Sequence, residues 1–245
     1  MSVDTLFGLL SEECAPLVWS LQVMDFLQGP CFAQTLSKAL GVAIVAGSLV
    51  LKVPQILTVV AAGQAQLSWT SVLIETFGYG VTVAYNLRSG YSFDSWGEAL
   101  FILLQNALLL FFVLKYQNKG VAVSFVLPLL LLALSYGLSL GVLPWTVLQT
   151  LQSCNTPIFA AARIPQIKDN FVQGHTGQLS LPTVALTFVG SLARVFTTLN
   201  KGGDFILLVG FASSAVLNGI ILAQVLLLWR ATANFLAQQK RKKQE

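Results

Sequence analysis

The chain has 245 residues, of which 55% are hydrophobic and only 10% are charged. Because ordinary soluble domains carry about 25% charged residues, this composition excludes a soluble globular protein and predicts an integral membrane protein. The net charge of +4 arises from few charged groups and a short basic tail, so nothing here points to nucleic-acid binding.

The N-terminal segment, residues 1–36, lacks the basic flank and cleavage pattern of a secretory signal, so we expect the first span to act as the insertion signal. It contains Cys14 and Cys31, and Cys154 is the third cysteine of the chain. The count is odd and the spacing does not suit a metal, which favours free thiols. A pair between Cys14 and Cys31 remains open if this segment is lumenal.

Apolar runs and turn signals predict seven membrane helices. Between Gly120 and Ala162 there is an uncharged run about twice as long as the roughly 20 residues that one span needs, so it holds two helices. Ser68, Ser180 and Asp204 are expected N-caps. The predicted helices are 37–60, 69–88, 96–116, 120–138, 144–168, 181–199 and 205–229.

The distribution of basic residues predicts the orientation of the chain. The tail "KRKKQE" (240–245) and the loops after the third and fifth helices place most Lys and Arg residues on one side, while the acidic N-terminal segment lies on the other. By the positive-inside rule the C-terminus is cytosolic and the N-terminus is outside or lumenal.

A short pattern occurs twice. "KVPQI" (52–56) is matched by "RIPQI" (163–167), and "QLS" (66–68) recurs at 178–180, so both pairs have nearly the same spacing. This repeat predicts two parallel three-helix bundles joined by one linker helix, a 3+1+3 arrangement. The expected parts are the N-terminal lumenal segment 1–36, a bundle at 37–116, the linker helix 117–140, a second bundle at 141–230 and a basic cytosolic tail at 231–245.

Each copy of the pattern is a candidate hinge. Pro54 and Pro165 lack an N–H and press on the carbonyl four residues earlier, which predicts a kink with a freed acceptor. In lipid that acceptor needs a partner, and the adjacent Gln55 or Gln166 can supply one. The alternative is a kink that only shapes helix packing.

The basic-apolar-Pro-Gln motif at the start of each bundle resembles the PQ-loop proteins, which include sugar uniporters and lysosomal amino-acid exporters. Three further stretches, "SWGEALF" (95–101), "GHTGQLS" (174–180) and "GSLARVFT" (190–197), resemble the group within this family that is named for mannose-P-dolichol utilization. The second resemblance extends over nearly the whole chain.

That resemblance implies a protein of the endoplasmic reticulum membrane, needed for mannose-P-dolichol and glucose-P-dolichol to be used in N-glycosylation, O- and C-mannosylation and GPI-anchor synthesis. The expected partner is a dolichol-linked monosaccharide phosphate within the bilayer, to be bound, presented or translocated without a cofactor. Lys242 and Lys243 resemble a cytosolic dilysine signal for retrieval to this compartment.

Four charged residues inside predicted spans are candidate binding groups. Lys52 and Glu75 lie at similar depths and either form a structural ion pair or line a site. Arg163 and Arg194 are suited to a phosphate through their guanidinium forks, or else extend to the nearer membrane surface.

Asn106 and Asn218 occupy equivalent positions in the third and seventh helices. They match the asparagine pair that faces the substrate in sugar-carrying PQ-loop relatives, and the alternative is hydrogen bonding between helices. Further polar residues could extend such a track: Gln105, Asn86 and Asn155.

Two other functions stay open: a facilitative transporter of a sugar or amino acid, and a receptor or chaperone for a glycosyltransferase of the endoplasmic reticulum. An enzyme is disfavoured. His175 is the one histidine of the chain, so a His-based triad or metal site lacks parts, and no metal-binding Asp-x-Asp motif is present.

Overall fold

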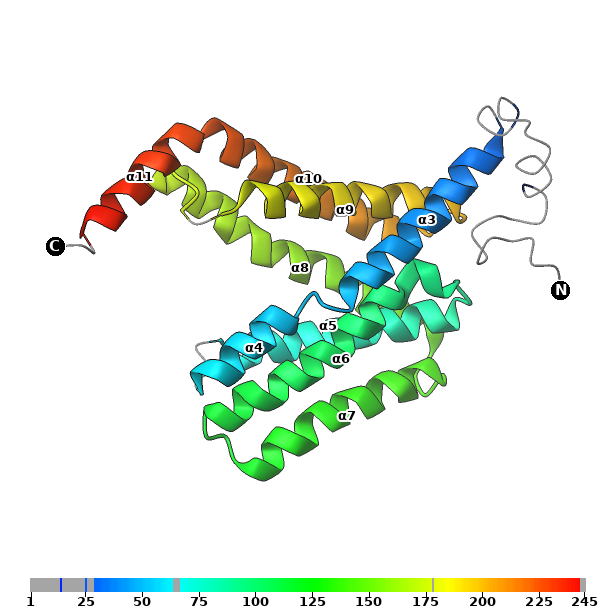
Figure 1. The fold of residues 1–245 in the computed structure, drawn as a ribbon. Helices are drawn as coiled ribbons and strands as arrows, with labels where there is room; N and C mark the ends of the chain where they lie inside the picture. Colours follow the sequence, from blue (N-terminus) through cyan, green and yellow to red (C-terminus); the bar gives the residue numbers. More distant parts are fainter. Residues whose placement is uncertain (1–13, 15–24, 26–28, 64–66, 178, 243–245) are drawn as a thin grey trace. The chain divides into compact units, whose positions relative to one another are not determined.

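The computed structural model describes residues 14, 25, 29–63, 67–177 and 179–242, and every regular element there is an α-helix (Figure 1). The helices are α3 (Pro30–Ser48), α4 (Val53–Ala62), α5 (Trp69–Arg88), α6 (Phe93–Tyr116), α7 (Val121–Ser139), α8 (Trp145–Gln173), α9 (Leu181–Asn200), α10 (Phe205–Leu227) and α11 (Trp229–Lys242).

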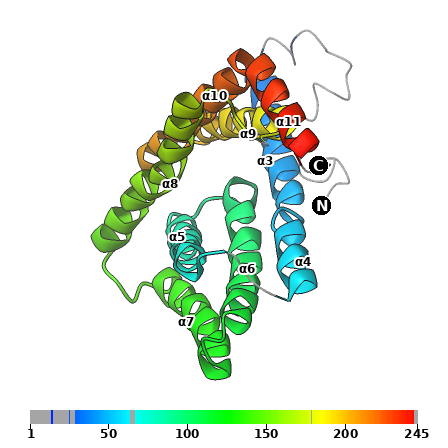
Figure 2. The same cartoon turned by 90° about the vertical axis from the view of Figure 1, so that its left-hand side faces the viewer.

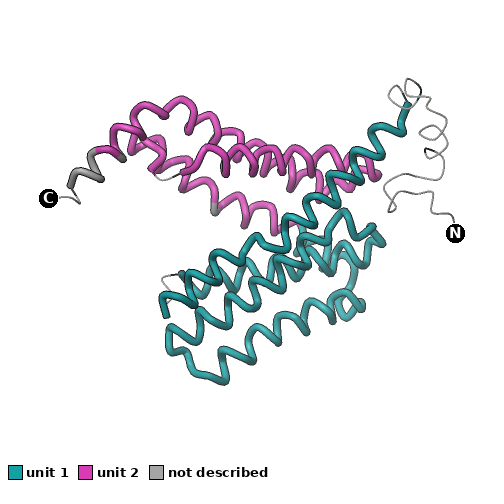
Figure 3. The backbone as a smooth tube through the Cα atoms, viewed as in Figure 1, with its two compact units in different colours: residues 1–152 teal, residues 153–245 magenta. Residues whose placement is uncertain are grey.

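The chain divides into two compact units, residues 1–152 and 153–245 (Figure 3). In unit 1, the predicted linker helix is α7, which packs against α5 and α6 (Figure 2). In unit 2, α9 packs along α10. The boundary between the units lies inside α8. The two compact units therefore do not coincide with the two bundles predicted from the sequence repeat, and the bounds of those bundles stay a prediction.

The core of unit 1 joins α4, α5, α6 and α7. Its most buried members are Leu109, Leu110 and Val113 of α6, each with no exposed surface. Gly80 of α5 lies directly against Ser135 of α7, where any side chain at position 80 would clash. Close packing of this kind holds membrane helices together, because lipid is as apolar as the side chains and supplies little hydrophobic drive.

Five stretches of the described chain are long and apolar enough to cross a membrane: Pro30–Ala62, Phe93–Tyr116, Val121–Ser139, Leu181–Asn200 and Phe205–Leu227. Seven spans were expected. The other two predicted spans correspond to α5 and α8, which have 20 and 29 residues and so are long enough, since about 20 residues reach across the hydrocarbon. Their polar and charged residues, such as Glu75 and Lys168, lower their apolar character. The seven-span arrangement therefore stays a prediction.

Two predicted N-caps are confirmed. The Ser68 hydroxyl accepts a hydrogen bond from the N–H of Ser71 at 3.4 Å, and the Asp204 carboxylate accepts one from the N–H of Leu207 at 2.9 Å. Ser180 takes the N-cap position of α9 without a side-chain hydrogen bond of this kind.

The first predicted helix, 37–60, is broken rather than bent. Residues 49–52 are unwound between α3 and α4, and Pro54 lies in the first turn of α4, where its missing N–H leaves no bond unmade (Figure 1). Pro165, in contrast, lies inside the continuous helix α8. The two copies of the motif therefore differ, because only the first interrupts its helix.

The expectation of three free thiols was wrong. Cys14 and Cys31 form a disulfide with Cα atoms 5.5 Å apart, and Cys154 is free and exposed. The spacing of 17 residues along the chain gave no sign of this pair, because the fold of the N-terminal segment decides which thiols meet.

The basic tail contains a helix that the sequence analysis did not include. The last predicted helix ends at Leu227, and a further helix, α11, follows it. The loop before α9 contacts α11 through His175 and Thr176. The His175 and Phe235 rings stack with centroids 3.7 Å apart, and the Thr232 hydroxyl accepts a hydrogen bond from the Thr176 N–H at 3.0 Å. Both contacts lie within unit 2.

Candidate functional site

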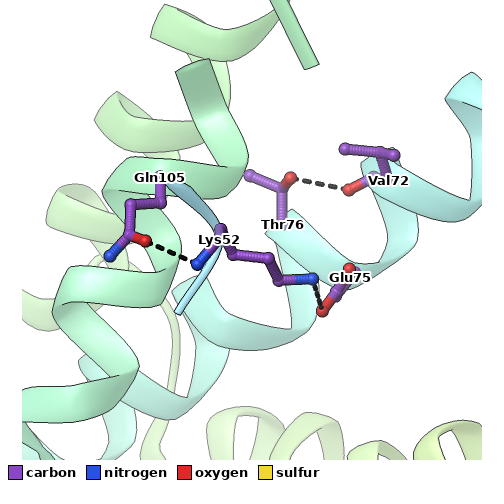
Figure 4. Close-up of polar contacts among 5 residues, drawn as sticks. All are labelled: Lys52, Val72, Glu75, Thr76 and Gln105. Carbon is purple, nitrogen blue, oxygen red and sulfur yellow. Dashed lines mark hydrogen bonds and ion pairs between the residues drawn. The ribbon is translucent and has the colours of Figure 1, made fainter. Parts of the chain in front are cut away.

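The break between α3 and α4 is bridged by a side chain from α6. The Lys52 N–H donates to Oε1 of Gln105 at 2.8 Å, and Nε2 of Gln105 donates to the Ser48 carbonyl at 2.8 Å (Figure 4 shows the Lys52 contact). In an unbroken α-helix the N–H of residue 52 would bond to the carbonyl of residue 48. The Gln105 amide therefore lies between the Lys52 N–H and the Ser48 carbonyl and bonds to both, in place of the direct hydrogen bond that a continuous helix would have.

Gln55 was expected to satisfy the Val50 carbonyl that Pro54 leaves free, but this carbonyl accepts a hydrogen bond from the Val53 N–H at 3.2 Å instead. The side-chain amide at the break comes from Gln105 of α6, a helix far from the break in sequence. Sequence reasoning had placed Gln105 only in a polar track. No sequence signal could have assigned it to the break, because the contact depends on how α6 packs against α3 and α4.

The Lys52 side chain is held as well. Its Nζ lies 2.7 Å from Oε1 of Glu75 on α5, and the two side chains are 16% and 31% exposed (Figure 4). The predicted ion pair is therefore present in unit 1. Lys52 is fixed by α6 through its main chain and by α5 through its side chain, so two neighbouring helices converge on the break.

The equivalent position in unit 2 is arranged differently. Arg163 is exposed, and its Nη1 lies 3.5 Å from Oε1 of Gln166, in the same turn of α8. A glutamine of α10 contacts α8 further on: Nε2 of Gln224 donates to the Ile167 carbonyl at 2.9 Å, and its Oε1 accepts from Asn170 at 2.9 Å. Sequence reasoning missed both Gln224 and Asn170.

Asn106, next to Gln105 on α6, has no exposed surface, and neither amide atom has a hydrogen-bond partner within the described part of the chain. Buried amides are normally hydrogen-bonded, and an unsatisfied one in a native protein calls for an explanation such as a bound water or ligand. Asn106 is therefore the group in unit 1 best placed to gain from binding a polar molecule.

Asn218 on α10 is also buried, but its amide is satisfied. Its Nδ2 donates to the hydroxyls of Ser191 on α9 and Ser214 on α10, at 2.8 and 3.2 Å. Hydrogen bonding between helices, the alternative given for this pair, is therefore present for Asn218. When the two repeats are aligned so that Asn218 matches Asn106, the counterparts of these serines are Tyr79 and Ile102, so Asn106 lacks them.

Arg194 on α9 is 5% exposed and is the one charged residue in the buried class among the described residues. It follows Ser191 by three positions, so the two side chains lie on the same face of α9. Burying a guanidinium inside a membrane helix is costly and usually marks a functional group. The structure thus separates the two candidate arginines, since Arg194 is buried and Arg163 is exposed.

The remaining polar candidates are buried in the helices. Asn86 donates from Nδ2 to the Thr82 carbonyl one turn earlier at 2.8 Å, and Asn155 of α8 is 5% exposed. Within the described residues, no group of three or more His, Cys, Asp or Glu side chains is arranged to hold a metal ion.

The family model described as "PQ loop repeat" matches residues 36–95 and 147–207, ranges that include Pro54 and Pro165 respectively. The molecule is therefore a helical membrane protein with two PQ-loop repeats, and the chain belongs to the PQ-loop repeat family.

The chain is similar in sequence to solute carrier family 66 member 3 of Homo sapiens. The two chains are 29% identical over 184 residues, which cover 75% of this chain and 89% of the relative. No solved structure matches the chain.

Proposed function

We propose that the protein acts in the endoplasmic reticulum membrane, where it enables mannose-P-dolichol and glucose-P-dolichol to be used in glycosylation and GPI-anchor synthesis. It does so by binding the phosphosugar headgroup and presenting or translocating it. The resemblance of three stretches to the mannose-P-dolichol utilization group supports this function, and one of them, residues 190–197, contains both Ser191 and Arg194.

The observation that carries the proposal is the buried polar cluster of unit 2. Arg194 offers a guanidinium that suits phosphate oxygens, and the Asn218 amide with its serine partners offers groups that suit sugar hydroxyls. These groups lie on α9 and α10, two helices apolar enough to cross the membrane. The expected ligand matches these three features, because it has an anionic phosphate, a sugar and a lipid chain in the membrane.

In the proposed architecture, seven spans form two three-helix bundles joined by α7. The motif of unit 1 is the moving part, because its helix is already broken and its loose groups are satisfied by a side chain that can release them. The unsatisfied amide of Asn106 belongs to the same turn of α6 as Gln105, so a ligand bound at Asn106 would act on the hinge through a shift of α6.

We further propose a lumenal N-terminus and a cytosolic C-terminus. The Cys14–Cys31 disulfide supports a lumenal N-terminal segment, because disulfides persist in oxidising compartments. The basic residues of the tail support a cytosolic C-terminus. Of the two lysines proposed as a retrieval signal, Lys242 is the last residue of α11, and Lys243 lies outside the described residues.

A cellular experiment tests the phosphosugar function. Cells that lack the protein are complemented with Arg194→Gln, with Arg194→Lys or with Arg163→Gln, the matched control at an exposed arginine. We expect Arg194→Gln to leave glycans stalled at steps that need mannose-P-dolichol at normal protein abundance, and Arg163→Gln to restore them. Complete glycans in cells with Arg194→Gln would refute the role of this cluster. Arg194→Lys keeps the positive charge but lacks the forked guanidinium, so it shows which of the two properties is needed.

Facilitated transport of a sugar or amino acid is the second candidate, favoured by the relation to a solute carrier. Purified protein in proteoliposomes separates the two functions. Scrambling of a short-chain dolichol phosphosugar without uptake of free sugars or amino acids supports the first, and the reverse result supports the second. Co-purification of a glycosyltransferase without either activity would favour a receptor or chaperone.

A further inference from the structure

A groove of about 310 Å³ lies at the hairpin between α6 and α7 in unit 1. Its walls include the rings of Phe111 on α6 and Phe125 on α7, whose centroids are 4.7 Å apart. Lys115 is the charged residue in its lining. None of these residues belongs to the helix break or to the buried polar clusters, so the groove is a separate feature of the molecule.

The charged side chain of the lining lies near the loop, and its two aromatic rings lie further from the loop. Lys115 and Val121 flank the loop that joins the two helices, whereas Phe111 and Phe125 each lie four residues further from it, about one turn or roughly 6 Å. Both helices are apolar enough to cross a membrane, so the loop lies at the membrane–water boundary. The groove therefore has a charged outer end and an aromatic inner end, which is the polarity of an amphiphile.

The outer end is positively charged. From Ala99 to Ile167 the sequence has no acidic residue, and Glu75 of the neighbouring α5 is paired with Lys52. Lys115 is exposed, with Nζ 6.0 Å from the Phe111 ring centroid. The N-cap of α7 is Gly120, which has no side chain to cap the first-turn N–H groups at the same end of the groove. An anion placed there would meet a cation and free donors.

The inner end continues onto an apolar surface. Phe125, Val126 and Leu129 of α7 are 54%, 60% and 62% exposed. A soluble anion would use only Lys115 and leave this surface unused, whereas an acyl chain would cover it. The occupant that fits both ends is a lipid.

We propose that this groove binds one anionic phospholipid, with its phosphate at Lys115 and an acyl chain along Phe111 and Phe125. In the proposed orientation the loop faces the cytosolic leaflet, where anionic phospholipids are concentrated. The site does not depend on the phosphosugar function, because it shares no residue with the clusters that carry that function.

Lipid retention tests the proposal. The full chain is reconstituted in vesicles with equal amounts of phosphatidylcholine and phosphatidylserine and extracted in mild detergent, and retained lipid is counted by native mass spectrometry. We expect one phosphatidylserine per chain, and about fivefold less in Lys115→Gln, the effect of one basic residue at an anionic surface. Phe125→Ala, at a side chain that is 54% exposed, should also reduce retention without unfolding the protein.

Lys119→Gln is the matched control, because Lys119 lies in the same loop with Nζ 5.7 Å from the Trp69 ring and does not line the groove. Equal retention of the two phospholipids, or unchanged retention in Lys115→Gln, overturns the proposal. Displacement of phosphatidylserine by inorganic phosphate alone would reveal a free-anion site and also overturn it. Retention of an added dolichol phosphosugar in place of phosphatidylserine would also overturn the lipid proposal, although it would not contradict the proposed function.

Discussion

The side-chain amide of Gln105 accepts a hydrogen bond from the Lys52 main chain at 2.8 Å, and the same amide donates to the Ser48 carbonyl one turn earlier. A break in a membrane helix persists only when its loose backbone groups find partners, because lipid offers none. The break between α3 and α4 is therefore stabilised by α6, and a substitution at Gln105 should change the conformation of residues 49–52.

Gln105→Leu should destabilise the protein and loosen the break. The substitution leaves the Lys52 N–H without its acceptor, and an unsatisfied buried group costs about 1–3 kcal/mol. We expect a lower midpoint of thermal unfolding in detergent and faster amide hydrogen exchange in residues 49–53. Leu108→Ala is the control, because Leu108 lies on the same helix and is 48% exposed. Unchanged exchange in Gln105→Leu would show that the amide does not hold the break.

Replacing the two prolines should have unequal effects. Pro54→Ala restores an N–H that can donate to the Val50 carbonyl, so α3 and α4 can join, whereas α8 is already continuous at Pro165. Spin labels at the exposed positions 42 and 57 should move toward the ~22 Å spacing of a continuous helix in Pro54→Ala. The distance between labels at 158 and 171 should not change in Pro165→Ala. Equal changes of distance in both variants would contradict the difference between the broken first helix and the continuous α8.

Much of the fold was predictable because it depends on composition and local chemistry. The shortage of charges predicted membrane helices, and the Pro-Gln repeat predicted the family. Matching depths gave an ion pair as one of two alternatives for Lys52 and Glu75, and the structure contains this pair. Asp204 was recognised as a cap because capping depends on residues within one turn.

The features that the sequence did not reveal depend on contacts between distant segments. Gln105 meets Lys52 across 53 residues, and Gln224 meets Ile167 across 57, so neither contact follows from a local pattern. The helix α11 was missed for the same reason, since the stacking of Phe235 on His175 joins two segments that are distant in sequence.

The Lys52–Glu75 pair should behave as a coupled unit. Glu75→Gln leaves the Lys52 ammonium without its partner among low-dielectric surroundings and should lower the free energy of unfolding by about 1–3 kcal/mol, less than for a fully buried pair because both side chains are partly exposed. In the series with methionine, Glu75→Met should cause a similar loss, and the double variant Lys52→Met with Glu75→Met should recover most of it. A double-mutant cycle of thermal unfolding measures the coupling, and simple additivity would contradict it.

Thiol titration should find one reactive cysteine before reduction and three after it. Cys154 is free and exposed, whereas Cys14 and Cys31 are bonded to each other. Maleimide labelling of the protein from intact microsomes, counted by mass spectrometry, makes the measurement. Cys154→Ala is the control and should show no labelling until a reductant is added. Three labelled thiols without reductant would rule out the disulfide and remove its support for a lumenal N-terminus.

The two asparagines should respond in opposite directions when each is replaced by leucine. Asn106 is buried with both amide atoms unpartnered in the described chain, so Asn106→Leu removes an unsatisfied group and should leave stability unchanged or raise it. Asn218→Leu removes hydrogen bonds to Ser191 and Ser214 and should lower the free energy of unfolding by about 0.6–1.7 kcal/mol, the range for such bonds between membrane helices. If Asn106 binds ligand, Asn106→Leu should nevertheless abolish phosphosugar handling in proteoliposomes. A variant that is both destabilised and fully active would assign Asn106 to packing instead.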